Sequence, residues 1–260
     1  MHAPAHVDSG SPITAAQAGA GLPNGLHHLA IATRDAKAQI EFFTDVIGLE
    51  LVALYWMHGV ADTVHAFLRL SDTASLAFVQ GPQMQHIEPQ LGVSHAGFTA
   101  GPVAPGAVQH VALNVDGEDD LLALRDRIRS RGHFVMGPID HGVCKSIYLV
   151  APEGLQLEFS TWSGVIDAER WIDPEVVAFC SIDAADLARY RAPAAFASHG
   201  GAVPQPDPRA KPNFVFPAEM REMGETLFAA SDAEIAMALD HPEPPVPARA
   251  ASSSSTGGMG

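Results

Sequence analysis

The sequence predicts an α+β fold built from two consecutive βαβββ modules, whose strands form one curved mixed sheet around a cavity. Two observations lead to this fold class. Strand-like and helix-like hydrophobic periodicities follow one another in the same order in residues 25–80 and 107–160. The first strand of each half also carries a similar motif, H-L-A-I at His28 and H-V-A-L at His110, 82 positions apart (110 − 28). An internal duplication explains both observations.

The first module is predicted from four strand patterns and one helix pattern. Residues 26–33 alternate between small or polar side chains and aliphatic ones, which is typical of a strand with two different faces. A helix follows from Asp35, with apolar residues at helical spacing and Gly48 as its C-terminal stop. Apolar runs at 49–55, 64–70 and 76–80 predict the three remaining strands.

The second module repeats this order after a connector, residues 81–106, that is rich in Gly, Pro, Gln and His. Residues 107–115 predict its first strand, and apolar residues at helical spacing predict a helix that stops at Gly132. Strands are expected at 133–136, 146–150 and 155–160, the last two joined by a Pro-Glu-Gly turn. Together the two modules make one domain over residues 25–162.

Both ends of the chain differ from the modules in composition. Residues 1–24 are dominated by Ala, Gly, Pro and Ser and predict a flexible arm, and residues 241–260 predict a disordered tail. Residues 163–240 contain too little apolar sequence for a core of their own. They predict a C-terminal helical and irregular extension that wraps the modules or a partner subunit, with helices at 184–190 and 217–239.

The composition disfavours several kinds of partner. The formal net charge of −15 argues against nucleic acid and anionic membrane, because both would repel the chain. Two cysteines make no disulfide framework, no apolar run approaches the roughly 18 residues of a membrane span, and the N-terminus lacks the order of a signal peptide. These features predict a soluble, cytoplasmic protein. Thirteen histidines against fifteen Lys and Arg direct attention to metal binding and acid–base chemistry.

Strand alternation brings three metal-binding side chains to one side of the predicted sheet. His28 and His110 each share a face with alanines, and Glu158 shares a face with Gln156 and Ser160, whereas the opposite faces are aliphatic. When the aliphatic faces pack on the helices, the hollow side collects the two histidines and the glutamate. Two neutral imidazoles and one carboxylate form the facial triad of non-haem Fe(II) sites. His28, His110 and Glu158 are therefore predicted to bind Fe(II), and the same ligand set accepts Mn(II).

The stretch from Ile139 to Glu158 resembles a known family. It reads I-x-H, five residues, I-Y, two residues, A-P-x-G, three residues and E, which matches the ring-cleavage signature of type I extradiol dioxygenases. These enzymes belong to the vicinal oxygen chelate superfamily, together with glyoxalases and bleomycin-resistance proteins, and the resemblance covers about residues 25–162. It implies that His28, His110 and Glu158 hold Fe(II). It also implies that His141 and Tyr148 hydrogen-bond the bound catecholate or oxygen.

The resemblance further implies an acid–base histidine near the end of the first module. His95, fifteen residues before His110 (110 − 95), is the candidate, and His86 is the rival. The implied reaction is cleavage of a catechol-type aromatic diol by O2. Catechol, biphenyl-diol and fused-ring diols all suit the same triad. Paired modules of this type often dimerise, so a homo-oligomer is expected.

Two other functions of the same fold compete with this interpretation. A glyoxalase-like isomerase or lyase commonly takes a fourth metal ligand from the last strand of the first module, where alignment of the two modules places Ala77. A non-catalytic small-molecule binding protein of the bleomycin-resistance kind has no use for two histidines and a glutamate facing one cavity. The residues therefore favour the dioxygenase.

Overall fold

The computed structural model describes residues 22–196, 200–207 and 214–247. The arm predicted at 1–24 and the tail predicted at 241–260 lie largely outside these ranges. The chain divides into two compact units, residues 1–54 with 64–197 and residues 55–63 with 198–260. Within the described ranges, no helix is both long enough and apolar enough to cross a membrane.

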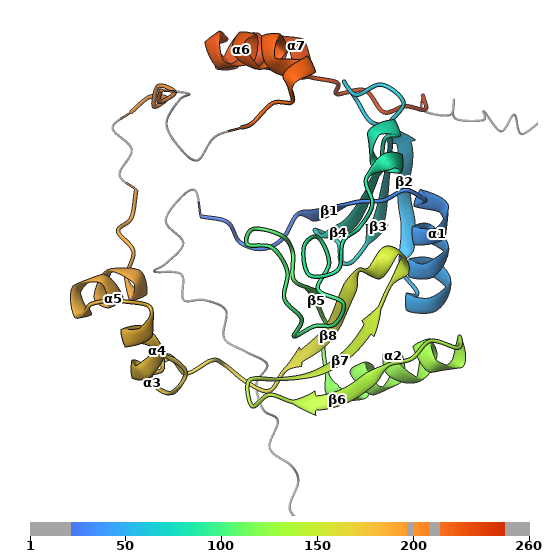
Figure 1. Cartoon of the computed structure of the whole chain (residues 1–260), viewed down its shortest axis with the longest axis vertical. Helices are drawn as coiled ribbons and strands as arrows, with labels where there is room; N and C mark the ends of the chain where they lie inside the picture. The colour runs from blue at the N-terminus through green and yellow to red at the C-terminus, as the bar shows by residue number, and fades with distance from the viewer. Residues whose placement is uncertain (1–21, 197–199, 208–213, 248–260) are drawn as a thin grey trace, which may run out of the picture. The chain divides into compact units, whose positions relative to one another are not determined.

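The first unit contains both βαβββ modules (Figure 1). The first module consists of β1 (His28–Ala32), α1 (Ala36–Glu41), the π-helix η2 (Phe42–Ile47), β2 (Glu50–Trp56), β3 (Val64–Arg69) and β4 (Ser75–Gln80). The second consists of β5 (Val111–Asn114), α2 (Glu118–Ser130), β6 (Met136–Asp140), β7 (Cys144–Val150) and β8 (Gln156–Trp162). The α+β class and the repeated order of elements are confirmed.

The strands form two four-stranded mixed sheets, with the orders β1-β4-β3-β2 and β5-β8-β7-β6. The hydrogen bonds run within each module, so the eight strands that were expected in one sheet are divided between two. In both sheets the first strand pairs in parallel with the last. Ala30 lies opposite Ala77 in the first sheet, and Ala112 lies opposite Glu158 in the second. The duplication therefore extends to the register of the strands, and Ala77 occupies the position equivalent to Glu158.

The helices cover one face of each sheet, as the aliphatic strand faces predict. The first helix contacts β3 and β4, and α2 contacts β7 and β8. One buried core joins the two modules, and its fully buried side chains include Phe43, Phe78, Leu121, Ile147 and Leu157. The opposite strand faces remain free to carry polar groups.

Local hydrogen bonds explain where the helices of the modules begin and end. The side chain of Asp35 caps α1 by accepting from the backbone N–H of Ala38, and Gly48 ends η2 with a φ of 101°. The strand predicted at 133–136 is wrong, because β6 begins at Met136. The backbone N–H of His133 donates to the carbonyl of Ile128, so this segment closes the last turn of α2 instead.

Three short helices follow the modules: α3 (Ala168–Trp171), α4 (Pro174–Phe179) and α5 (Ala184–Arg191). The last of them confirms the helix predicted at 184–190. The other two were not predicted, and each begins at an aspartate, Asp167 or Asp173, that accepts from a backbone N–H in its first turn. The indole of Trp171 lies against Gly142, where an added Cβ would come within 3.2 Å of the ring.

The second unit contains the 3-10 helix η5 (Ala218–Met220) and the helices α6 (Arg221–Ala229) and α7 (Asp232–Leu239). The single helix predicted at 217–239 is therefore wrong. Ser231 interrupts it, because its side chain forms a capping box with Glu234 that starts a new helix. Within this unit the ring of Phe216 packs against Phe228 and against Gly224.

Candidate metal centre

Polar side chains gather on the second sheet, on the face opposite its buried aliphatic residues. Strands β7 and β8 pair so that Tyr148 lies opposite Glu158 and Ser146 lies opposite Ser160. Glu158 is buried, with 8% of its surface exposed. The Nε2 atom of His110, which directly precedes β5, lies 3.0 Å from Oε2 of Glu158. Two of the three predicted metal ligands are therefore in contact.

The other carboxylate oxygen of Glu158 is occupied by hydroxyl groups. Its Oε1 accepts hydrogen bonds from Ser160 at 2.7 Å and from Tyr148 at 3.2 Å. The hydroxyl of Ser160 also bonds to that of Ser146 at 2.8 Å, and Ser146 is fully buried. With Oε1 held in this way, the carboxylate turns Oε2 towards His110.

The surroundings of Glu158 and Tyr148 shift the pKa values of these two groups in opposite directions. Burial opposes ionisation of Glu158, but three neighbouring hydroxyls and the His110 imidazole outweigh it, so the pKa of the carboxyl lies below its usual value. Burial raises the pKa of the Tyr148 phenol, and the negative charge of Glu158 raises it further. A hydrogen bond from Ser146 acts in the opposite direction but does not cancel this rise in the pKa. Near neutral pH the site therefore holds a carboxylate and a protonated phenol.

A second hydrogen bond extends this network to His141. Its Nε2 lies 2.7 Å from the hydroxyl oxygen of Tyr148. The phenol has a single proton, which it donates to Glu158. His141 must therefore donate its own Nε2–H to the phenol oxygen. The three signature residues form one chain of donors that ends on the carboxylate.

The protonation of His110 follows from its neighbour Gln109. The amide nitrogen Nε2 of Gln109 donates to two backbone carbonyls, those of Thr99 and Gly101. The amide oxygen Oε1 therefore faces Nδ1 of His110, and the imidazole must donate from that nitrogen. In the neutral ring, Nε2 then carries a lone pair that points at Oε2 of Glu158.

This geometry suits a divalent metal ion. A lone pair and a carboxylate oxygen 3.0 Å apart repel each other unless a proton or a cation lies between them. Two ligand atoms that each lie about 2.1 Å from one metal ion, at a right angle, are themselves about 3 Å apart. The observed separation fits two ligand atoms of one metal ion, and it equally fits a hydrogen bond from a protonated Nε2. His110 and Glu158 therefore fit two adjacent positions of a metal site.

The structure does not bring His28 to the same pair. The ring contacts of His28 are with His27 and with Phe67 on β3. Across the described ranges, no group of three or more His, Cys, Asp or Glu side chains is arranged to hold a metal ion. His28 lies on the strand face predicted for it, opposite Leu29 and Ile31. Its role as the third ligand stays a prediction.

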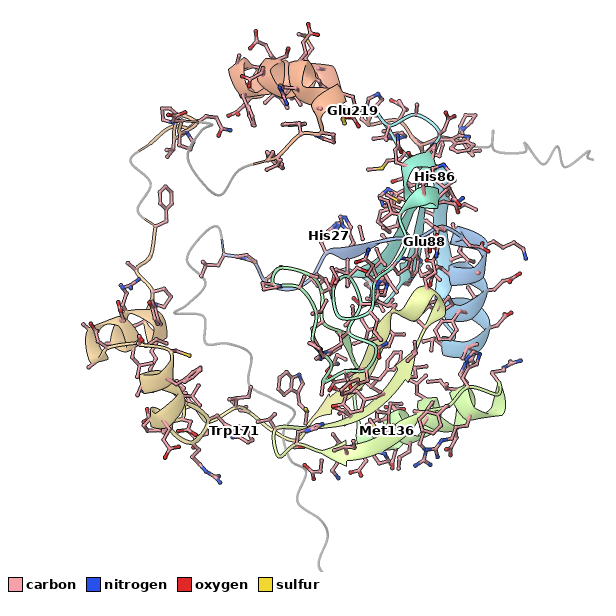
Figure 2. All side chains as sticks on the ribbon, viewed as in Figure 1. His27, His86, Glu88, Met136, Trp171 and Glu219 are labelled. Carbon is pink, nitrogen blue, oxygen red and sulfur yellow. The ribbon has the colours of Figure 1, made fainter. Side chains whose placement is uncertain are left out.

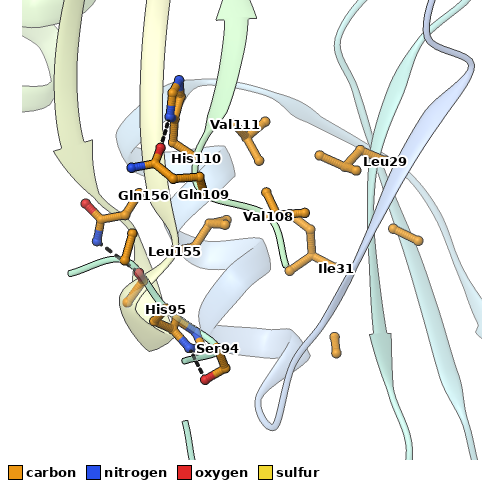
Figure 3. A pocket seen from close by; sticks show the side chains of 14 residues that line it. Leu29, Ile31, Ser94, His95, Val108, Gln109, His110, Val111, Leu155 and Gln156 are labelled. Carbon is orange, nitrogen blue, oxygen red and sulfur yellow. Dashed lines mark hydrogen bonds between the residues drawn. The ribbon is translucent and has the colours of Figure 1, made fainter. Parts of the chain in front are cut away.

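A pocket of about 270 Å³ lies between the two modules; His110 lines it, whereas Glu158 does not. Its walls are β1, residues 94–96, residues 108–111 and residues 154–156, and both His95 and His110 line it (Figure 3). The Nδ1 atom of His95 bonds to the hydroxyl of Ser94 at 2.8 Å. The ring also packs on Gly154, where an added Cβ would lie 3.3 Å from Cδ2.

The rival histidine lies elsewhere. His86 is exposed at the end of the 3-10 helix η3 (Pro82–His86) and does not line this pocket (Figure 2). Of the two candidates for acid–base chemistry, His95 shares a pocket with His110 and His86 does not.

Several residues of the site were not predicted from the sequence. Strand alternation already places Ser160 on the face of Glu158, and the same rule could have found Ser146. Ser94 lies in the connector, where no periodicity predicts the direction of a side chain, and Gln109 lies in the strand predicted at 107–115 but before Val111, where β5 begins. Their position next to a candidate histidine is the single signal available.

The chain matches the model of a known family. A family model described as the Glyoxalase/Bleomycin resistance protein/Dioxygenase superfamily matches residues 25–159. No curated protein matches the chain. A solved glyoxylase/bleomycin resistance protein/dioxygenase domain from Frankia sp. EAN1pec is 13% identical, with a TM-score of 0.42, over 54% of this chain and 99% of that one.

Two further solved structures are similar at the same level. A lactoylglutathione lyase from Agrobacterium tumefaciens is 17% identical, with a TM-score of 0.38, over 54% of this chain and 94% of that one. The fosfomycin resistance protein FosX from Listeria monocytogenes, solved with Mn(II) and sulfate, is 13% identical, with a TM-score of 0.37, over 55% and 95% of the two chains.

Proposed function

Because the chain belongs to the Glyoxalase/Bleomycin resistance protein/Dioxygenase superfamily, we propose that it is a metal-dependent extradiol dioxygenase. The proposed substrates are a catechol-type aromatic diol and O2, and the proposed metal is Fe(II), with Mn(II) as the alternative. One observation carries the proposal: Oε2 of Glu158 faces Nε2 of His110 at 3.0 Å, while Tyr148 and His141 form a donor chain to Oε1. The three residues on the carboxylate side all belong to the ring-cleavage signature.

The proposed ligand set combines residues of both modules. His110 and Glu158 supply two ligands, and His28, the residue equivalent to His110 in the first module, supplies the third. With iron bound, these residues would give the site a Lewis acid for the diol and a path for electrons between the aromatic ring and O2. In the overall reaction a ring carbon–carbon bond next to the diol breaks, and both atoms of O2 enter the product.

The remaining site residues bind the diol and move protons. His141 and Tyr148 carry N–H and O–H groups that donate within the site, to the phenol oxygen and to Glu158; turned towards a bound diol or oxygen, they would stabilise negative charge there. Ser94 holds Nδ1 of His95, which leaves Nε2 free to take a proton from a diol hydroxyl and to return it during ring opening. The aliphatic walls of the pocket, which include Leu29 and Leu155, exclude water and pack against the ring.

The strand register argues against a glyoxalase-like reaction. Ala77 occupies the position equivalent to Glu158 and is fully buried, so the first module offers no carboxylate there. The fourth ligand common in that group of enzymes has no counterpart at this position. A set of three protein ligands leaves more of the metal open to a chelating diol and O2.

The proposal is tested with protein that is purified without oxygen, stripped with a chelator and reloaded with Fe(II) or Mn(II). We expect one bound metal ion per chain, and O2 uptake with a yellow product when catechol or a biphenyl-diol is added in air. His110→Ala and Glu158→Ala should lose the metal ion and all turnover. His95→Ala should keep the metal ion and lose turnover, and His86→Ala is the matched control that should change neither.

Two results would contradict the proposal. One is wild-type protein that takes up neither Fe(II) nor Mn(II), which would favour a non-catalytic binding protein. The other is unchanged turnover in His110→Ala. The predicted homo-oligomer is checked separately by gel filtration with light scattering.

A further inference from the structure

We propose that Gln109 is a positioning residue that holds two parts of the site at once, the imidazole of His110 and the loop at residues 91–104 that carries His95. The inference rests on the proposed function, because it treats His110 as a metal ligand and His95 as a proton carrier. Gln109 is half-buried, precedes β5 and lies outside the ring-cleavage signature.

The oxygen end of the amide acts on the ligand. Oε1 of Gln109 accepts the hydrogen bond from Nδ1 of His110. This bond fixes the tautomer with Nε2 unprotonated and restrains rotation of the ring. It thereby keeps Nε2 aimed at Oε2 of Glu158, 3.0 Å away. The imidazole is thereby oriented for a metal ion before any metal ion binds.

The nitrogen end of the same amide holds the loop. Nε2 of Gln109 donates to the carbonyls of Thr99 and Gly101, the latter at 3.1 Å. Gly101 packs so closely on Ala96 that an added Cβ would lie 1.9 Å from its carbonyl oxygen. Ala96 is buried and directly follows His95. A short path of contacts therefore leads from the amide to the acid–base histidine.

Hydrogen bonds within the loop join its two sides, so we expect residues 91–104 to move together. The backbone N–H of Gly92 donates to the carbonyl of His95 at 2.7 Å, and that of Ala104 donates to Val93 at 2.9 Å. Fixing one side of such a loop limits the movement of the other side. The amide of Gln109 thus sets the position of His95 relative to His110 across the pocket that both residues line.

The two ends of the amide can be separated by substitution. Gln109→Leu removes both interactions. Gln109→Glu keeps an acceptor for Nδ1–H of His110 but places carboxylate oxygen against the two loop carbonyls, which it repels. Gln85→Leu is the matched control, since the amide of the exposed Gln85 also donates to a backbone carbonyl, that of Arg34 at 2.9 Å, and Gln85 does not line the pocket.

The effects are measured on the full chain by three methods. Titration with Co(II) reports metal affinity, hydrogen exchange reports the amides of residues 92–104, and ring ¹⁵N NMR of the metal-free protein at pH 8 reports the tautomer of His110. We expect Gln109→Leu to weaken Co(II) binding by about 10- to 100-fold and to speed exchange in the loop. Gln109→Glu should speed exchange while Co(II) affinity stays near the wild-type value, and Gln85→Leu should change neither.

The outcomes distinguish this inference from the proposed function. If the wild-type protein binds none of Co(II), Fe(II) and Mn(II), the proposed function is wrong. The tautomer and exchange measurements need no metal, so they still decide the role of Gln109. An Nδ1–H tautomer in wild type and Gln109→Glu that is lost in Gln109→Leu supports it. The same tautomer and the same loop exchange in all variants overturn it. If Gln109→Leu does not fold, as judged by circular dichroism, the loop exchange of Gln109→Glu decides.

Discussion

Replacement of Glu153 tests whether the two modules depend on one another at the pocket. Glu153 lies in the 3-10 turn η4 (Pro152–Gly154) between β7 and β8. Its Oε1 accepts from the backbone N–H of Arg34 at 2.8 Å, and its Oε2 accepts from Nε2 of Gln39 at 3.0 Å. Gln39 is 1% exposed. One carboxylate of the second module therefore binds the corner between β1 and α1 of the first.

The size of the effect follows from these contacts. A hydrogen bond to a charged group contributes roughly 1.5–3 kcal/mol, and Glu153→Ala removes two of them. Because 24% of the side chain is exposed, water recovers part of the loss. The buried amide of Gln39 also loses its charged partner. We expect Glu153→Ala to lower the free energy of unfolding by about 2–4 kcal/mol.

Two companion variants separate hydrogen bonding from backbone strain. Glu153 has a φ of 60°, which costs a residue with a Cβ roughly 1 kcal/mol that glycine does not pay. Glu153→Gly should therefore be more stable than Glu153→Ala by about that amount. Glu153→Gln should be mild, because Oε1 of Gln39 has no partner among the described residues and can accept from the new amide.

Urea unfolding followed by circular dichroism measures these differences. The pocket walls at 29–32 and 154–156 flank the contact, so Glu153→Ala should also raise the KM for a diol. A loss below about 0.5 kcal/mol in Glu153→Ala, or a Glu153→Gly variant less stable than Glu153→Ala, would refute the reasoning.

Three further predictions concern the site. Ser160→Ala removes the 2.7 Å hydrogen bond that orients the Glu158 carboxylate, so Co(II) affinity should fall about tenfold in a titration, unlike in the exposed control Ser163→Ala. Burial, and then the charge of His28, lower the pKa of His65, so below pH 6.5 the unfolded chain binds a proton that the folded chain does not. Stability in urea should therefore fall from pH 7 to pH 5, and less steeply in His65→Gln; equal slopes would count against this. Gly154→Ala combines a φ of 80° with a contact to His95, whereas Gly132→Ala has a φ of 83° and open space. Both should lose roughly 1 kcal/mol of stability in urea unfolding, but a steady-state assay should find a lower kcat in Gly154→Ala alone.

The fold was largely predictable because it depends on periodicity. Alternation along β1 and β5 placed His28 and His110 opposite aliphatic faces, and those faces do pack on the helices. The contact between His110 and Glu158 follows from the same rule, since parallel pairing sets Ala112 beside Glu158. The division of the strands between two sheets was not predictable, because it depends on how the modules pack and not on any one strand.

The parts of the site that the sequence did not reveal lie where no repeating pattern exists. The direction of the Gln109 side chain is set by two carbonyls in an irregular loop. The break between α6 and α7 is a local competition, in which the capping box of Ser231 outweighs apolar spacing that suits a longer helix. Both effects depend on individual hydrogen bonds, which become visible only when the backbone is in place.

The shared register of the two sheets also determines how a ligand is oriented. Phe67 lies opposite Ala77 in the first sheet, as Tyr148 lies opposite Glu158 in the second. Two identical halves would present the same surface twice, and a flat molecule could bind between them in either of two equivalent orientations. Here the first sheet has an aromatic ring and a methyl group at the positions where the second has a phenol and a carboxylate. We therefore expect a ligand with oxygen atoms at one end to turn that end towards the second sheet.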